Sequence, residues 1–335
     1  MNRKHISMPA RYLINLALTV ALWAILFGLI QSGVITNYWS GILVTIGINV
    51  ILTVSLNVAT GYLGQLPLGH AGFMAVGAYA GGIFMKVTPL ASLLKEGNTI
   101  AALPYIVLAL LISGVVAGVV GLIIGIPALR LRGDYLAIIT LGFEFTGGAA
   151  GLKQIPKISS FTLVFICVAL TCLVIHMVMK SRHGRAVLAI RENEIAAESV
   201  GINTTYYKTM AFVMSAFFAG IAGCLYAGYL GSLFPATFKF MKSIEILVMV
   251  VLGGMGSMLG SVVAATVLTV ISELLRSVGD LRMVFYSLAL VLMMIFRPKG
   301  LMGSYDFSMS RLLEKLINGE FGRKKSEENK KGGDK

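Results

Sequence analysis

The chain of 335 residues is 57% hydrophobic and only 13% charged, and its mean hydropathy is +0.85. These values exclude an ordinary soluble domain, which needs more charged side chains on its surface, and indicate a polytopic membrane protein. The net charge of +13 does not indicate nucleic-acid binding, because the basic residues gather at the N-terminus, in short loops and in the tail.

The apolar runs of the chain predict about ten transmembrane or half-membrane helices, because about 20 apolar residues are needed to cross the hydrocarbon core. We interpret the first run, Tyr12–Ser32, as a transmembrane helix and not as a cleavable signal peptide, since it is long enough to cross. The runs cover approximately residues 12–32, 38–59, 68–87, 103–128, 135–150, 158–179, 209–231, 243–254, 257–275 and 281–296. The predicted fold class is therefore an all-α polytopic membrane protein with glycine-rich breaks.

The basic clusters of the chain test this topology, since lysine and arginine in short loops favour the cytoplasmic side. If residues 1–11 are a cytoplasmic N-terminus, the predicted crossings also place the clusters at residues 130–132, 180–191 and 297–299 on the cytoplasmic side. We therefore predict that both the N- and C-termini are cytoplasmic. Residues 304–335 form a basic tail without an apolar period, which we expect to be disordered.

The fifth predicted segment, residues 135–150, is short and contains Glu144 and several glycines. It must cross the membrane if the basic clusters before and after it are to lie on the same side, so we predict a partial helix packed against protein. A carboxylate inside a span is a functional candidate. For Glu144 we favour a position near the outer interface of a short helix.

The segment GYLGQLPLGHAGFMAVGAYAGG, which follows the second predicted span, predicts a glycine-rich break in a helix. Transporters use such breaks to expose backbone groups to a polar pathway, and irregular backbone is tolerated there only where protein or a cavity covers it. The candidates for the translocation path or gating are Gln65, Pro67, Gly69, His70 and Gly72. For His70 we favour a structural or gating role over direct contact with substrate.

Glycines four residues apart predict close helix packing, because both members of such a pair lie on one helix face. The pairs are Gly77 with Gly81, Gly114 with Gly118, and Gly121 with Gly125. A second break, LGGMGSMLGS at residues 252–261, predicts a tight turn or re-entrant packing between two short helices. Before this break lies Glu245, either a docking residue or an interfacial charge, and we favour the interfacial charge.

The longest polar interior segment, residues 180–208, is predicted to lie in the cytoplasm and to contain a short helix. Glu194 and Glu198 are four residues apart on one helix face, and Gly201 is placed to end the helix. Such a helix suits a groove in a soluble partner, and a solvated connector fits the same residues equally well.

The segment IAAESVG in this loop resembles the cytoplasmic coupling motif of ABC importer permeases, whose signature is Glu-Ala-Ala, three residues and Gly. Ala196, Ala197 and Gly201 match the signature. Ile195 stands at its Glu position, and Glu194 comes one residue earlier.

Longer motifs occur in the same order as in one family. They are LNVATGYLGQLPLGHAGFMAVGAYAGG, IPALRLRGDYLAIITLGF, GRAVLAIRENEIAAESVGIN and GGMGSMLGSVVAATVLTVISELLR. With them the chain resembles the branched-chain amino acid ABC transporter permeases of the LivM type, from about Ile42 to Gly303. It departs from that family after Phe143, where a longer helix and an outer loop are expected before Thr146.

The resemblance implies a permease subunit of an ABC importer in the bacterial inner membrane, which translocates branched-chain amino acids. It implies as partners ATP-binding cassette subunits that hydrolyse ATP, a second related permease subunit, an extracytoplasmic substrate-binding protein and membrane lipid. The permease domain would cover residues 12–303 and include the coupling loop at residues 180–208. The residues that we expect to couple to the ATPase are Glu194, Ala196, Ala197, Glu198 and Gly201.

We compared the sequence with what two other classes of membrane protein and another ABC permease would require. An ion-coupled secondary transporter shares the broken helices but needs more ionisable residues at mid-membrane. An intramembrane enzyme needs a convergent acid and base, and the sequence offers neither such a pair nor an HExxH motif or nucleophile elbow, so we predict that the chain is not an enzyme. Among ABC permeases, another small polar solute such as urea or a sugar is the alternative substrate.

The cysteines of the chain give no sign of a metal or redox site. Cys167, Cys172 and Cys224 all lie inside apolar runs, and none forms a CxxC pair. We interpret them as small buried hydrophobic residues. The sequence therefore predicts no disulfide, no metal and no other cofactor.

Overall fold

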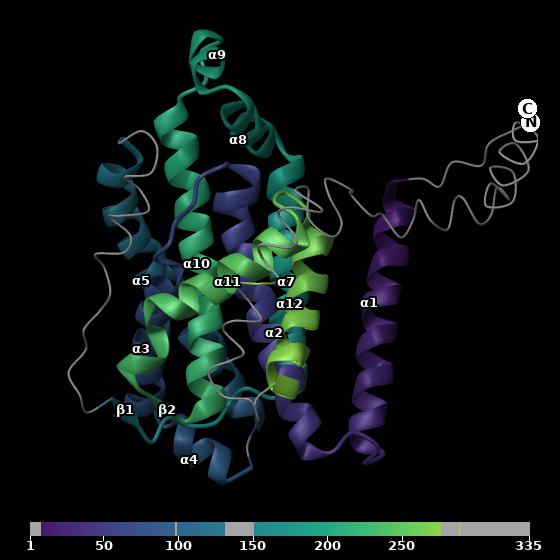
Figure 1. Ribbon diagram of the computed structural model, residues 1–335. Coiled ribbons are helices and arrows are strands. Elements are labelled where there is room, and N and C mark those ends of the chain that lie inside the picture. Colours follow the sequence, from purple (N-terminus) through teal and green to yellow (C-terminus); the bar gives the residue numbers. More distant parts are fainter. Residues whose placement is uncertain (1–7, 98, 131–150, 276–287, 289–335) are drawn as a thin grey trace, which may run out of the picture. The chain divides into compact units, whose positions relative to one another are not determined.

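The computed structural model describes residues 8–97, 99–130, 151–275 and 288 (Figure 1). By its internal contacts the chain separates into two units, residues 1–35 with 305–335 and residues 36–304. In the described part of the first unit, α1 (Met8–Gln31) is one continuous helix. It ends just before Gly33, whose left-handed backbone, with φ of 73°, is typical of a helix C-terminus.

The described part of the second unit is almost entirely helical. Its helices are α2 (Asn37–Asn57), the π-helical turn η1 (Val58–Tyr62), α3 (His70–Val87), α4 (Leu90–Lys95), α5 (Thr99–Arg130), α7 (Phe161–Lys180), α8 (Arg182–Glu192), α9 (Glu194–Ser199), α10 (Thr204–Leu230), the 3-10 turn η2 (Pro235–Phe238), α11 (Phe240–Gly253) and α12 (Met258–Leu274). Two short strands, β1 (Leu152–Lys153) and β2 (Ser232–Leu233), pair antiparallel. Apart from this pair, the described residues agree with the all-α prediction.

Four described helical stretches are long and apolar enough to cross a membrane. They are Asn37–Tyr62, Ile100–Ile126, Phe161–Lys180 and Thr204–Leu230, and the shorter apolar helices are Ala17–Gln31 and Met258–Leu274. A polytopic membrane protein is therefore supported. The predicted segments at 135–150, with Glu144, and at 281–296, except Leu288, lie outside the described residues, as do both chain ends.

The ends of the helices follow from local sequence chemistry. A polar side chain before the helix accepts a hydrogen bond from a free backbone N–H of the first turn. Ser160 caps α7 in this way at the amide of Leu163, and Asn203 caps α10 at the amide of Tyr206. At its other end α10 stops at Gly231, which has φ of 73°.

Small residues let helices of the second unit approach closely, and of the glycines predicted from the spacing Gly77 and Gly121 lie at such contacts, whereas Gly118 has room for a Cβ atom. A Cβ atom on Gly77 of α3 would lie 2.3 Å from the Cα atom of Gly220 of α10, and one on Gly223 would lie 2.0 Å from the Met74 carbonyl oxygen. Gly121 of α5 similarly faces the Cβ atom of Ala216. The backbones of these three helices approach closely because these positions carry no side chain.

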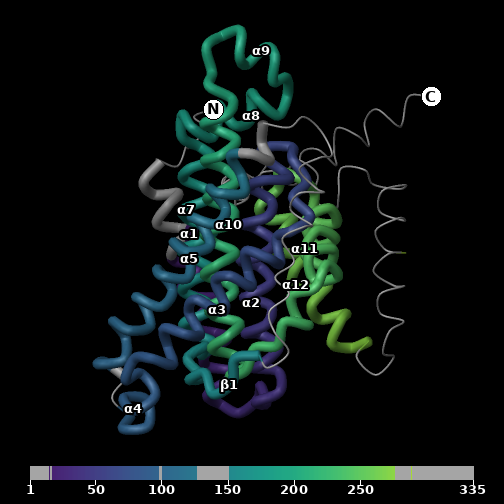
Figure 2. Tube along the Cα trace, turned by 90° about the vertical axis from the view of Figure 1, so that its left-hand side faces the viewer, coloured from purple at the N-terminus to yellow at the C-terminus, as the bar shows by residue number. Residues whose placement is uncertain are grey.

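The second unit has two distinct ends. Figures 1 and 2 both show α8 and α9 at one end and α4 with the strand β1 at the other. The basic residues predicted to be cytoplasmic, such as Arg182 and Arg191, belong to α8. The end with α8 and α9 is therefore the end that the sequence predicts to be cytoplasmic, and the end with β1 is the predicted outer end.

Candidate functional site

The predicted short helix of the polar loop is present as α9, and its two ends are defined by polar and glycine residues. Asn193 caps its start, with 3.0 Å between its side-chain oxygen and the amide of Ala196. Gly201 ends it with a left-handed backbone, φ of 85°, while the amide of Ile202 bonds to the carbonyl of Ala197. Gly201 is therefore the stop that the sequence predicted.

The faces of α9 divide into a buried and an exposed side. Ala197 is only 3% exposed and packs in the core, whereas Ile195 is 69% exposed and Val200 is 75% exposed. Ala196 is exposed as well. Of the predicted coupling residues, Ala197 therefore faces its own protein. The exposed apolar residues of α9 and its C-cap are Ile195, Ala196 and Val200, which we call the apolar patch, and the exposed Glu198 and Ser199 lie in the same helix.

Both carboxylates of α9 bind the start of α10. Glu194 forms an ion pair with Lys208, with 2.6 Å between Oε1 and Nζ, and the Lys208 side chain is only 8% exposed. The hydroxyl of Thr204 donates to Glu198 at 2.8 Å. These contacts hold α9 against the first turns of α10. The sequence reasoning missed Lys208, although a single lysine at the start of an apolar span is the signal that marks it.

The first glycine-rich break lies between α2 and α3, as predicted. The helix of α2 widens into η1, where the amide of Leu63 bonds to the carbonyl of Val58, and the chain is then irregular until His70. Gln65 is half-buried, and among the described residues its side-chain oxygen has no hydrogen-bond partner. Pro67 is buried in the connection.

The other predicted residues of the break form the beginning of α3. Gly69 precedes this helix, and its carbonyl accepts from the amide of Gly72 at 2.9 Å. His70 is 1% exposed, and its Nε2 atom lies 3.1 Å from the hydroxyl of Ser55 on α2. The side chain of His70 therefore bridges the two helices that flank the break.

The start of α3 is also fixed to α11. The amide of Ala71 donates to the hydroxyl of Ser243, at 3.0 Å. In this way one of the free N–H groups of the first turn of α3 is satisfied by a neighbouring helix.

The second break is a tight turn between α11 and α12. Gly254 and Gly256 have φ of 105° and 87°, values that side chains disfavour, and Ser257 caps α12 at the amide of Gly260. A Cβ atom on Gly260 would lie 2.0 Å from the carbonyl oxygen of Gly253, so the two helices cross in close contact.

Asn57 joins the two breaks. This residue is fully buried at the end of α2, its amide nitrogen donates to the carbonyl of Ser257, and its oxygen accepts from the amide of Gly256, at 3.1 and 2.9 Å. A Cβ atom on Gly61 would lie 2.2 Å from the Gly256 nitrogen and 1.8 Å from the Asn57 oxygen. The breaks are therefore one connected site, which the sequence reasoning treated as two.

The polar loop reaches the same site. Arg191, in the last turn of α8, donates from Nη1 to the carbonyl oxygen of Gly61. Its aliphatic stem passes over Gly64, where a Cβ atom would lie 3.1 Å from Cγ of the arginine. The predicted coupling loop and the predicted path region therefore meet through this side chain.

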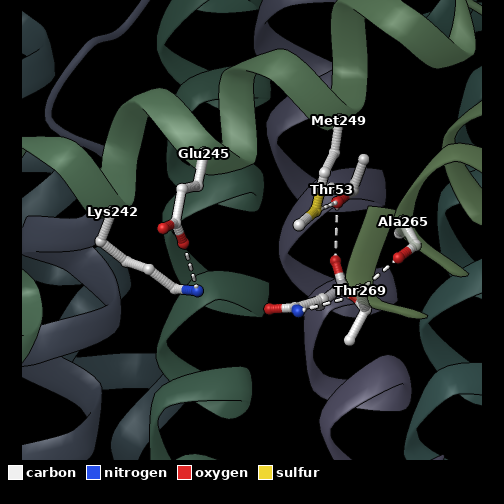
Figure 3. Close-up of polar contacts among 7 residues, drawn as sticks. Thr53, Lys242, Glu245, Met249, Ala265 and Thr269 are labelled. Atoms are coloured by element: carbon white, nitrogen blue, oxygen red, sulfur yellow. Dashed lines mark hydrogen bonds and ion pairs between the residues drawn. The ribbon is translucent and has the colours of Figure 1, made fainter. Parts of the chain in front are cut away.

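Polar contacts also attach α11 and α12 to α2 (Figure 3). The amide of Asn49 donates to the hydroxyl of Thr269 at 2.9 Å, and Thr53 contacts the sulfur of Met249 at 3.5 Å. Asn49 and Thr53 belong to α2, Met249 belongs to α11 and Thr269 belongs to α12.

Glu245 is paired within its own helix. Its carboxylate lies 3.1 Å from the ammonium group of Lys242, one turn earlier in α11, and Figure 3 shows the two side chains next to each other. Both side chains are half-buried.

Ionisable side chains give no sign of a metal site. Within the described residues no three His, Cys, Asp or Glu side chains lie close enough to hold a metal ion. The three cysteines are free thiols. Cys224 is fully buried, as predicted, whereas Cys167 and Cys172 are only half-buried on α7.

The chain is similar to a known protein family and to several known proteins. The model of the family "Branched-chain amino acid transport system / permease component" matches residues 38–296. The high-affinity branched-chain amino acid transport system permease protein LivM of Salmonella typhimurium is 36% identical over 306 residues, which cover 78% of this chain and 68% of that protein. LivM of Escherichia coli is 36% identical over 305 residues, with 77% and 67% covered.

More distant relatives cover less of the chain. The autoinducer 2 import system permease protein LsrC of Salmonella paratyphi B is 33% identical over 198 residues, which cover 52% of this chain and 56% of that protein. No solved structure matches the chain.

These relatives confirm the resemblance that the motifs carried. Since they are named as permeases of transport systems, they also confirm the prediction of a transporter and not an enzyme. The family match covers the described helices from α2 to α12. The chain therefore belongs to the branched-chain amino acid transport system permease family.

Proposed function

We propose that this chain is the membrane-spanning permease subunit of an ABC importer that translocates branched-chain amino acids. The observation that carries this proposal is the 36% identity to LivM over 78% of the chain. ATP is hydrolysed on separate subunits, an extracytoplasmic binding protein delivers the substrate, and a second related permease completes the path. The complex lies in the bacterial inner membrane. LsrC, named for a different solute, matches a smaller share of the chain, so we favour branched-chain amino acids.

We propose further that α9 is the element that couples the permease to the ATPase. Its apolar patch of Ile195, Ala196 and Val200 is exposed at the end of the unit that carries α8 and α9, where a soluble partner has access. Glu194 and Glu198 support coupling from within, because they fasten α9 to α10. Gly201 ends the helix with a left-handed backbone, and α10 begins three residues later at Thr204.

For the break between α2 and α3 we propose a role in the translocation path and its gating. The candidate residues are Gln65, Pro67, Gly69, His70 and Gly72. The side-chain oxygen of Gln65 is buried without a hydrogen-bond partner among the described residues, which supports a polar role for this residue in the break. The contact of His70 with Ser55 supports a gating or positioning role for the histidine.

Two experiments test the proposed function. The tagged chain is purified from its native membrane in mild detergent, and the proteins that accompany it are identified by mass spectrometry. We expect ATP-binding subunits and a second permease. The complex is then placed in proteoliposomes with its binding protein and ATP, and uptake of radiolabelled leucine, isoleucine and valine is compared with uptake of fructose and urea. ATP-driven uptake of fructose or urea alone would contradict the substrate assignment.

A further inference from the structure

Arg191 stands on an anchored helix. Val187 and Ile190, which precede it in α8, are buried, so the apolar side of α8 packs against the protein. Arg191 is followed by Glu192 and then by Asn193, which caps α9. The arginine therefore occupies the junction between α8 and the proposed coupling helix α9.

The guanidinium group binds a backbone oxygen that the helix has left free. In a continuing α-helix the amide of Gln65 would donate to the carbonyl of Gly61, but it donates to the carbonyl of Ala59 at 3.0 Å. The oxygen of Gly61 instead accepts from Nη1 of Arg191. A charged donor replaces the missing backbone donor at the end of α2 and η1.

The same guanidinium group lies against the second break. A Cβ atom on Gly256 would lie 2.9 Å from Nη1 of Arg191 and 3.3 Å from the Gly61 oxygen. Glycine at this position leaves the space that the guanidinium group uses. Gly256 is in turn bonded to Asn57 on the other side of the site. Arg191 therefore touches both breaks at the point where Asn57 joins them.

Arg191 contributes a charged donor to this contact. Among the described residues, Lys208 forms an ion pair with Glu194 and Lys242 forms one with Glu245. Arg191 belongs to neither pair. Its partner is a carbonyl group of the break. A charge-assisted bond of this kind is stronger than a bond between neutral groups.

We propose that Arg191 is a positioning residue that transmits movement of the α8–α9 loop to the junction of the two helix breaks. This inference rests on the proposed function, in which α9 receives the movement of the ATPase. When the loop shifts, the carbonyl of Gly61 moves with the guanidinium group, and Asn57 carries the shift to Gly256 and Ser257. The ends of α2 and α11 and the starts of α3 and α12 thereby move together.

The test uses the complete importer in proteoliposomes and measures amino acid molecules transported for each ATP hydrolysed. Arg191→Met keeps the aliphatic stem over Gly64 and removes the donor. We expect the transport-to-ATP ratio to fall about tenfold, the effect of losing one charged hydrogen bond, while the ATPase subunits still co-purify. The matched control is Arg185→Met, an exposed arginine of the same helix, which should keep the ratio of the unmodified complex.

The ratio is insensitive to the amount of folded complex, so a purely structural role would not change it. Arg191→Lys, which keeps a charged donor, should give a ratio between those of the Met variant and the unmodified complex. An unchanged ratio in the Met variant overturns the proposal. If the Met variant fails to assemble, Arg191→Gln, which also removes the charge, is measured in its place, and an unchanged ratio in that variant overturns the proposal. Absence of ATP-driven uptake in the unmodified complex would instead refute the proposed function.

Discussion

Glu194 and Lys208 are bound to each other across the junction of α9 and α10, with 2.6 Å between their charged atoms. We expect Glu194→Ala to lower the free energy of unfolding by about 2 kcal/mol, because it leaves the buried ammonium group of Lys208 without a partner. The measurement is thermal unfolding of the purified protein in detergent. The control is Glu245→Ala, which removes the half-buried pair with Lys242 and should cost about 0.5 kcal/mol. Equal losses would contradict the distinction between the two pairs.

Substitutions in the exposed apolar patch of α9 test partner binding without changing the buried side of this helix. We expect Ile195→Asp combined with Val200→Asp to reduce recovery of ATPase subunits about tenfold, because a charge replaces apolar contact area, with unchanged membrane insertion and thermal stability. Thr205→Asp, an exposed change at the start of α10, is the control and should leave recovery intact. Co-purification measures the recovery. Full recovery with the doubly charged patch would rule out α9 as the docking helix.

Ala197 should behave in the opposite way, because it faces the core. We expect Ala197→Phe to lower the free energy of unfolding by about 1–3 kcal/mol through overpacking. Thermal unfolding in detergent measures this loss. An unchanged midpoint would mean that the face of α9 with Ala197 is free.

Gly77 and Gly118 offer a matched pair in the helical core. We expect Gly77→Ala to lower the free energy of unfolding by about 2 kcal/mol, because its methyl group would meet the backbone of Gly220. At Gly118 the nearest atom, Cγ1 of Val213, would be 3.7 Å away, so Gly118→Ala has room and should be neutral or slightly stabilising. Thermal unfolding of the two variants side by side provides the measurement, and a stable Gly77→Ala protein would refute the close approach of α3 and α10.

His70 allows the gating role to be distinguished from substrate contact. We expect His70→Ala to lower both the thermal midpoint and the maximal uptake rate, and to leave the KM for the amino acid unchanged, because its contact is with Ser55. Ser55→Ala should act in the same direction and more weakly. A large rise in KM with an unchanged thermal midpoint would assign His70 to the substrate instead.

The helical stretches could be predicted from the sequence because a membrane requires long apolar runs, and a run is visible without knowing its neighbours. The segment at residues 158–179 corresponds in this way to α7 and that at 257–275 to α12. The end of α9 at Gly201 was predictable for a different reason, since a left-handed residue after a helix is a local property of the chain.

The contacts of the site could not be predicted in the same way. Asn57 bonds to residues about 200 positions later, and Arg191 to one 130 positions earlier. Periodicity indicates which side of a helix is polar, but not which distant segment that side meets. For the same reason the sequence reasoning did not distinguish the buried Ala197 from the exposed Ala196, since both residues match the coupling motif.

The close contacts around Gly61 restrict which amino acids can occupy this position. Every residue with a side chain would place its first carbon atom inside the space of Asn57 and Gly256, so no substitution at this codon escapes the collision. Leu66, a few residues later, is about half exposed and meets no such restriction. A saturation screen for growth on the imported nutrient should therefore return glycine alone at position 61 and a broad range of residues at position 66.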